Sequence, residues 1–356
     1  MSECFNLWHQ RSDHQTRPHF IYCFSIMYAN KSQTNITVGL RYQGLMERVL
    51  FSTLSTVPCC VFLFINGTML FTLRSKPVFR ETSRYILLYN LLFADTVNLA
   101  HSQLLYLIAA CRIRMTYPVC GVLSFFGNLT TVISPLTLVV MSLERYVAVC
   151  YPLRHATIIT IKNTELAIIV VWAFSSLSVL TRFLLLLNFP FDELDSLLMN
   201  DFCSAVAMLL GPLADDYDQT YTCILFVSTG MTVTCFYIGV MVAARSASTD
   251  KASAKKARNT LLLHLVQLGL SISSTIHNPF LTAISKVLDR IIIVRIQIIL
   301  YVCIIIFPRC LSALIYGIRD QTIRPVLMYH LCCQWKRSPF LSHSSTKAKV
   351  SILITS

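Results

Sequence analysis

Seven apolar runs, each long enough to cross a lipid bilayer, constrain the fold of this sequence more than any other feature. A transmembrane helix needs about 20 mostly apolar residues and satisfies its backbone hydrogen bonds internally. The chain is 55% hydrophobic and only 13% charged, unlike an ordinary water-soluble domain. We therefore predict an all-α membrane protein, a bundle of seven transmembrane helices. The predicted spans are 49–73, 85–110, 117–143, 165–187, 220–244, 260–284 and 292–317.

The net charge of +13 follows the expected membrane topology and does not indicate nucleic-acid binding. With the N-terminus outside, basic residues concentrate in the short inner connections, such as Arg74, Lys76 and Arg80 in the first. No Lys or Arg occurs from Phe183 to Ala244. Cytoplasmic loops carry such an excess of basic residues. We therefore predict a multi-pass protein of the plasma membrane with its C-terminus in the cytoplasm.

The segments around the helices divide the chain into three parts. Residues 1–47 form a polar N-terminal segment, in which Asn30 and Asn35 begin glycosylation sequons. Residues 48–330 are the transmembrane domain, and residues 331–356 form a cytoplasmic tail.

A short basic amphipathic helix is predicted from Gly317 to Tyr329 on the inner membrane surface. Cys332 and Cys333 follow it and are candidates for palmitoylation, which would add a contact with lipid. The loop 188–219 is the long outer connection, and its acidic residues either attract cationic ligands or are simply solvated. They are Asp192, Glu193, Asp195, Asp201, Asp215, Asp216 and Asp218.

The segment MSLERYVAVCYPLRHA, residues 141–156, carries the most specific motif. It places Glu144, Arg145 and Tyr146 at the end of the third span, where a charge pair indicates function. Glu-Arg-Tyr followed by Pro-Leu-Arg resembles the rhodopsin-like seven-helix receptors, and its longer form resembles the odorant receptors. Lys256-Ala-Arg258-Asn-Thr, with His264 beyond it, and Ile65-Asn66-Gly67-Thr68 extend the resemblance to teleost-type odorant receptors over about 48–330.

This resemblance implies a receptor for small odorants that activates a heterotrimeric G protein of the olfactory, stimulatory type. Arg145 would be the switch, neutralised at rest by Glu144, while Lys256 and Arg258 would face the G protein. His264 either contributes to the switch or is a satisfied core residue. Tyr316 would close the seventh helix, although Ser312 and Ala313 replace the usual Asn and Pro. Such receptors usually have shorter N-terminal segments. If translation starts at Met27, residues 1–26 are an extension introduced by the gene model.

Cys120 and Cys203 are expected to form a disulfide on the oxidising side of the membrane. The residues alone leave Cys111 and Cys223 as rival partners, and the resemblance favours Cys203.

Asp95 lies deep in the second span, where an ionised carboxylate needs a partner. The resemblance places Asp95 in a polar network with Asn66 and Ser134 that often holds sodium. Arg309 stands in the seventh span where a small polar residue is usual, so we expect it to pair with Asp95 and replace the ion. The alternative is that Arg309 faces another polar group or a water-filled cavity.

A ligand pocket is expected in the outer half of the bundle, between the third, fifth, sixth and seventh helices. The alternative for each residue is ordinary packing between helices. Gly127 stands where amine receptors carry a carboxylate, which argues against an amine as the ligand. The candidates are Ser124, Gly127, Asn128, Thr131, Val132, Thr275, Ile276, Tyr301, Val302 and Ile305.

Two other functions compete with an odorant receptor. One is a rhodopsin-like receptor for a peptide, lipid or nucleotide, and the other is a small transporter, although the paired broken helices typical of transporters are not found. No enzymatic arrangement, metal-ligand spacing or cofactor motif is recognised in the sequence, so neither catalysis nor a cofactor is expected.

Overall fold

The computed structural model describes the chain from residue 45 to residue 188 without a break and in parts thereafter. The later described residues are 198–199, 203–204, 208, 210, 212–246, 258–266, 269, 296, 299–300, 303, 306–307, 313, 317, 320 and 322–336.

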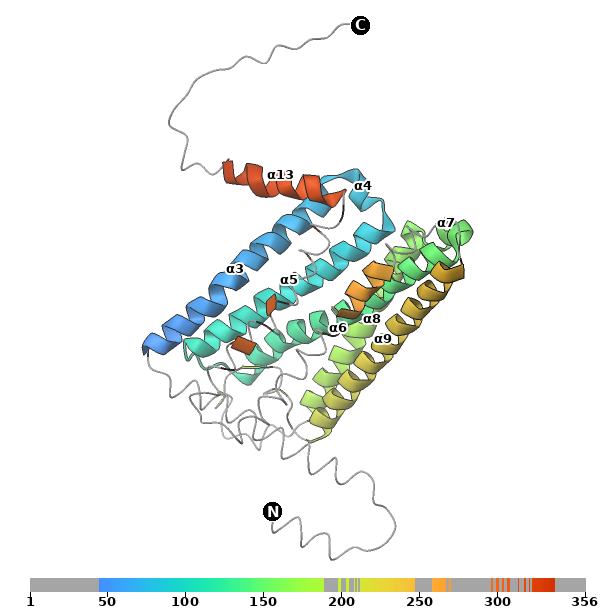
Figure 1. The fold of residues 1–356 in the computed structure, drawn as a ribbon. Coiled ribbons are helices and arrows are strands. Elements are labelled where there is room, and N and C mark those ends of the chain that lie inside the picture. Colours follow the sequence, from blue (N-terminus) through green and yellow to red (C-terminus); the bar gives the residue numbers. More distant parts are fainter. Residues whose placement is uncertain are drawn as a thin grey trace, which may run out of the picture.

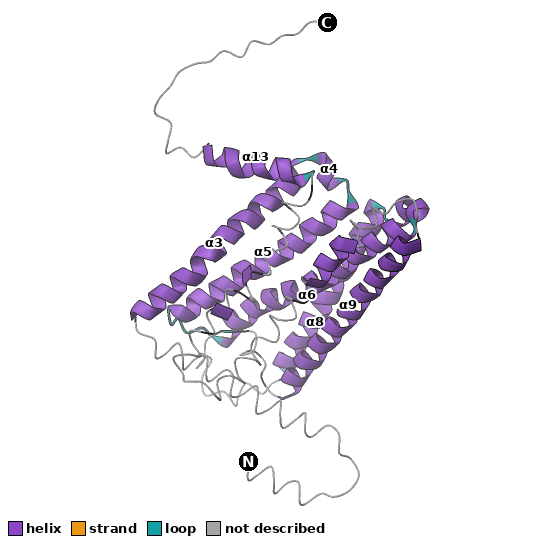
Figure 2. Cartoon of the chain, in the orientation of Figure 1, coloured by secondary structure: helices purple, strands orange, loops and turns teal. Residues whose placement is uncertain are grey.

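Five long helices lie side by side and form the described part of the bundle (Figure 1). They are α3 (Leu45–Ser75), α5 (Ser83–Ala110), α6 (Tyr117–Cys150), α8 (Ile161–Leu187) and α9 (Pro212–Ser246). Short helical turns connect them at one end: α4 (Pro77–Arg80), the 3₁₀ turn η1 (Pro152–Arg154) and α7 (His155–Ile158). The named elements of the described residues are all helices (Figure 2), and the prediction of an all-α bundle is confirmed.

Four described helices are long and apolar enough to cross a membrane. They comprise Val49–Ser75, Tyr117–Cys150, Ile161–Leu187 and Asp216–Ala243. Helix α8 shows the pattern most clearly, because it buries only a narrow stripe that includes Val171, Ser175 and Ser178. Its remaining surface is apolar and exposed, which suits contact with lipid chains but would be a liability in water. The exposed side chains include Leu166, Ile169, Val170, Phe174, Leu177, Leu180 and Leu184.

Helix α5 is not among these four, and its buried face carries several polar side chains. Asn90 lies between two neighbouring helices: its amide nitrogen donates to Thr137 of α6 at 2.9 Å, and its oxygen accepts from the Trp172 indole of α8 at 2.9 Å. Gln103 donates to Thr56 of α3 at 2.9 Å. These bonds satisfy polar groups that would otherwise be costly to bury.

Several helices extend beyond the apolar runs that predicted them, because helical hydrogen bonding does not end where hydrophobicity ends. Helix α6 continues to Cys150, whereas the predicted span ended at residue 143. Helix α9 begins at Pro212, so the predicted loop 188–219 is shorter than expected. The last three acidic residues of the predicted loop, Asp215, Asp216 and Asp218, belong to helix α9.

The final helix also begins later than predicted. Helix α13 spans Ile323–Lys336 instead of 317–329, and it lies across the end of the bundle near α4 (Figure 1). Asp320 sets this start, since its Oδ1 accepts from the backbone amides of Thr322 at 2.9 Å and Ile323 at 3.3 Å. Such capping satisfies amides that have no partner within the helix. Cys332 and Cys333 consequently lie inside α13, not after it.

Candidate functional site

Residues that the sequence predicts to be functional lie at the two ends of α6. One end bears Arg145 and is called the Arg145 end; the other bears Cys120 and is called the disulfide end. Turns α4 and α7 and helix α13 also lie at the Arg145 end (Figure 1).

At the Arg145 end, a buried carboxylate holds the arginine of the motif. Arg145 Nε lies 2.7 Å from Glu144 Oε2. His155 of α7 approaches the second oxygen, with Nε2 3.9 Å from Oε1. The Glu144 side chain is 9% exposed and that of Arg145 is 19% exposed, so solvent screens this ion pair less than one on an open surface.

His264 connects the sixth predicted helix to α6 close to this ion pair. Its Nδ1 lies 3.0 Å from the hydroxyl of Ser142, and the His264 side chain is fully buried. The Ser142 hydroxyl also lies 2.7 Å from Leu138 O, so donation to that carbonyl would pair with the His264 tautomer that carries its proton on Nδ1. Residues 258–266 are therefore hydrogen-bonded to α6 one turn before Arg145.

Tyr146 packs sideways onto α9. A Cβ on Gly239 would lie 2.5 Å from the Tyr146 ring, so this glycine permits close approach of the two helices. The Phe236 ring lies 5.3 Å from that of Tyr146, centroid to centroid. Neither Gly239 nor Phe236 was predicted from the sequence. The available sequence signal for this helix contact was a glycine within an apolar run.

In the middle of the bundle, Asp95 Oδ1 accepts from Ser134 Oγ at 2.7 Å. Both side chains are buried, as the predicted network requires. The amide of Asn66 is fully buried and makes no hydrogen bond among the described residues.

Ten of the predicted residues lie outside the described residues. They are Asn30, Asn35, Lys256, Thr275, Ile276, Tyr301, Val302, Ile305, Arg309 and Tyr316. Arg258 is described, and its guanidinium lies 3.4 Å from the side-chain oxygen of its neighbour Asn259.

At the disulfide end, Cys120 is bonded to Cys203, with an S–S distance of 2.00 Å and a Cα–Cα distance of 5.5 Å. The rival partners Cys111 and Cys223 are both free. A hydrogen bond from the Met199 amide to Met115 O, at 2.9 Å, also links the segment before α9 to the segment before α6. The connection before α9 is thus held against the start of α6.

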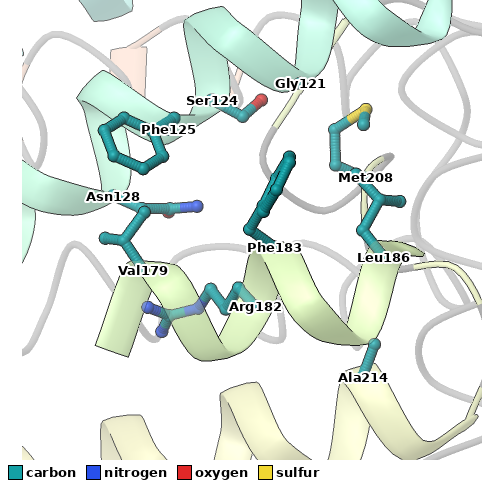
Figure 3. A pocket seen from close by; sticks show the side chains of 10 residues that line it. All are labelled: Gly121, Ser124, Phe125, Asn128, Val179, Arg182, Phe183, Leu186, Met208 and Ala214. Carbon is teal, nitrogen blue, oxygen red and sulfur yellow. The ribbon is translucent and has the colours of Figure 1, made fainter. Parts of the chain in front are cut away.

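A small, partly open cavity lies near the disulfide between α6, α8 and α9 (Figure 3). Its lining is mostly apolar, with three polar exceptions: Ser124 and Asn128 from α6, and Arg182 from α8. The remaining lining residues are Gly121, Phe125, Val179, Phe183, Leu186, Met208 and Ala214.

Two of the predicted pocket residues on α6, Ser124 and Asn128, line this cavity. The other three face elsewhere. Gly127 packs against the imidazole of His101, Thr131 accepts a hydrogen bond from Asn98 at 2.8 Å, and Val132 is buried. The stripe that was expected to face a ligand is therefore divided between the cavity and the contact with α5.

Arg182 is the functional candidate that the sequence interpretation missed. Its Nε and Nη2 lie 2.8 and 2.7 Å from Oδ1 of Asp218 on α9. The guanidinium also lies over the rings of Tyr217 and Tyr221, at 5.9 and 5.2 Å from their centroids. The signal in the sequence was a lone arginine inside an apolar span.

Comparison with known proteins agrees with this architecture. Residues 65–331 match the family model of the seven-transmembrane receptors of the rhodopsin family. The chain is 34% identical to Odorant receptor 131-2 of Danio rerio, over 84% of this chain and 89% of that protein. It is 24% identical to human Olfactory receptor 4K15, over 82% of this chain and 88% of the relative. The chain therefore belongs to the rhodopsin family of seven-transmembrane receptors.

Proposed function

We propose that this protein is an odorant receptor that binds a small, water-soluble odorant near the disulfide end. Binding would activate a heterotrimeric G protein of the stimulatory, olfactory type at the Arg145 end. The similarity to proteins named odorant and olfactory receptors supports this class over a receptor for a peptide, lipid or nucleotide.

The observation that carries the proposal is the Glu144–Arg145 ion pair beside the Ser142–His264 hydrogen bond. Together they form a two-part latch: the ion pair keeps the arginine from an outside partner, and the hydrogen bond holds the sixth helix against α6. Activation would break both and expose Arg145, Arg258 and Lys256 to the G protein. Such a latch has two discrete arrangements, which a ligand can bias by binding one of them better.

The proposed orientation places the disulfide end outside the cell and the Arg145 end in the cytoplasm. A disulfide persists in the oxidising extracellular environment, which supports this direction. Basic residues at the opposite end support it as well, because cytoplasmic loops are enriched in them. The N-terminus with Asn30 and Asn35 would then be glycosylated outside, and Cys332 and Cys333 of α13 would be palmitoylated at the inner surface.

Arg309 is proposed to pair with Asp95 and take the place of a sodium ion. The buried position of Asp95 supports a need for a cationic partner. Arg309→Ser is expected to make the receptor sensitive to sodium, and Asp95→Asn should show strong energetic coupling to it. Independent effects of the two substitutions would contradict this pairing.

A cyclic-AMP reporter assay in cells that express the receptor with a stimulatory olfactory-type G protein tests the function. Pooled water-soluble odorants should raise cyclic AMP with the wild type and not with Arg145→Ala at equal surface expression. Arg114→Ala removes an exposed arginine at the disulfide end, away from the proposed G-protein site, and serves as the matched control. Silence of a surface-expressed wild type toward odorants, with a response to a peptide, lipid or nucleotide, would overturn the odorant assignment.

A further inference from the structure

We propose that the cavity between α6, α8 and α9 selects uncharged molecules that carry a carbonyl-type hydrogen-bond acceptor on an apolar body. Arg182 and Asn128 are the residues that determine this selectivity, and the Arg182–Asp218 ion pair is the reason that the ligand must be uncharged. The inference rests on the proposed receptor function and specifies the chemical class of its ligand.

The walls of the cavity suit an apolar ligand body. Phe125 and Phe183, with Leu186 and Met208, supply large apolar surfaces. Figure 3 shows Phe183 rising from α8 and the amide of Asn128 reaching from α6 toward the same space. Small-molecule sites typically combine such walls with a few polar groups that fix orientation.

The guanidinium of Arg182 has hydrogen-bonding capacity left for a ligand. Its Nε and Nη2 both donate to Asp218, whereas Nη1 makes a long contact of 3.5 Å with Ser178 Oγ. Packing over Tyr217 and Tyr221 keeps the group in this orientation. An oriented guanidinium donates strong, charge-assisted hydrogen bonds without first losing much side-chain freedom.

The charge balance at the cavity decides which ligands it accepts. Asp218 already neutralises Arg182 and does not line the cavity; its side chain is 33% exposed, against 12% for Arg182. A carboxylate ligand would therefore bring a second negative charge to a single positive one and leave an uncompensated buried anion, which is costly.

A cationic ligand is also disfavoured, because the described lining residues of the cavity include Arg182 and no carboxylate. A carbonyl oxygen can accept from Arg182 and from the Asn128 amide without adding charge. Because Asp218 neutralises its charge, Arg182 acts as a hydrogen-bond donor to an uncharged ligand and not as a binding site for anions.

The experiment measures ligand binding to the purified full-length receptor in lipid nanodiscs, from the rise in melting temperature with ligand concentration. The probes are straight-chain methyl ketones, and carboxylates and primary amines with the same number of carbon atoms. The wild type should bind the best ketone about tenfold or more tightly than its matched carboxylate and amine, as expected for a hydrogen bond to a charged group.

Asp218→Asn is the decisive variant, because it keeps the shape and a hydrogen-bond acceptor but removes the compensating charge. It should shift the preference toward the carboxylate by about tenfold or more. Asp216→Asn removes the same charge from the same helix, is not bonded to Arg182 among the described contacts, and should leave the preference unchanged.

A preference of the wild type for carboxylates or amines would overturn the inference, as would an Asp218→Asn receptor that folds and keeps the wild-type preference. Should Asp218→Asn not fold, Asn128→Leu provides the second test. It leaves the ion pair intact and should weaken ketone binding about tenfold without strengthening carboxylate binding. Unchanged ketone binding in Asn128→Leu would contradict the assignment.

This design separates the ligand class from the coupling function, because binding is measured without a G protein. Arg145→Ala should bind the ketones like the wild type and fail only in the cyclic-AMP assay. Normal signalling without the predicted ligand preference would overturn this inference and leave the receptor function standing. Normal ligand preference without signalling would overturn the proposed coupling alone.

Discussion

The imidazole of His101 occupies the space that a side chain at position 127 would need. A Cβ built on Gly127 would lie 2.4 Å from Cε1 and 2.7 Å from Nδ1 of His101. Contacts this short do not occur between real atoms, so α5 and α6 approach closely here because residue 127 has no side chain. The position where amine receptors carry a carboxylate is therefore a packing site in this protein.

Gly127→Ala is expected to destabilise the receptor by about 1 to 3 kcal/mol, because the added methyl group overpacks a rigid contact. Gly67→Ala is the matched control, since a Cβ at Gly67 meets nothing within 4 Å. Alanine favours a helix over glycine by about 0.5 to 1 kcal/mol, so the control should be neutral or stabilising. Melting temperatures of the two variants in the same nanodiscs measure the difference.

His101→Ala should rescue Gly127→Ala, because it removes the ring that the new methyl group meets. A double-mutant cycle on melting free energies would report this coupling. Purely additive effects of the two substitutions would show that the clash is relieved elsewhere.

Glu144→Gln should raise signalling in the absence of odorant. The substitution removes the charge that holds Arg145, and a charge-assisted hydrogen bond contributes about 1.5 to 3 kcal/mol. The active population should rise by about tenfold at most, because only part of this free energy distinguishes the two states. Basal cyclic AMP at matched surface expression is the measurement. Glu165→Gln, at an exposed carboxylate early in α8, is the control and should have no effect.

Cys203→Ser should lower stability by about 2 to 5 kcal/mol, because the lost bond closes a long loop. The two cysteines are 83 residues apart in sequence. Cys120→Ser should have the same effect, and the double variant should be no worse than either single one. Cys111→Ser removes a free, exposed thiol and should leave the melting temperature unchanged. An additive loss in the double variant would mean that the cysteines act separately.

Asp320 caps α13 and also binds Arg84, whose Nη2 lies 3.0 Å from Asp320 Oδ2. Asp320→Asn should keep the cap and lose the ion pair, at a cost of about 1 kcal/mol or less because Arg84 is 25% exposed. Asp320→Ala loses both and should cost about 1 kcal/mol more. Hydrogen exchange of the first amides of α13 should accelerate clearly only in the alanine variant. Equal acceleration in both variants would assign the effect to the ion pair.

The sequence by itself predicted the five long helices α3, α5, α6, α8 and α9, their order and the position of the motif around Arg145, because hydrophobic length and local motifs are properties of contiguous residues. The contact between Glu144 and Arg145 was predictable from the sequence, because the two residues are adjacent in the chain. The prediction of α13 was less accurate: its amphipathic composition was visible, but its start depended on the cap that Asp320 provides through backbone geometry.

Only the tertiary structure decided which side chains meet across helices. The contacts of Arg182 with Asp218 and of His101 with Gly127 depend on how far each helix is rotated and shifted along its axis. In lipid, any apolar face can point outward, so hydropathy leaves that rotation nearly free, and close packing around small residues fixes it. For the same reason, the sequence located α6 and its stripe of candidates, whereas packing divided that stripe between a cavity and a helix contact.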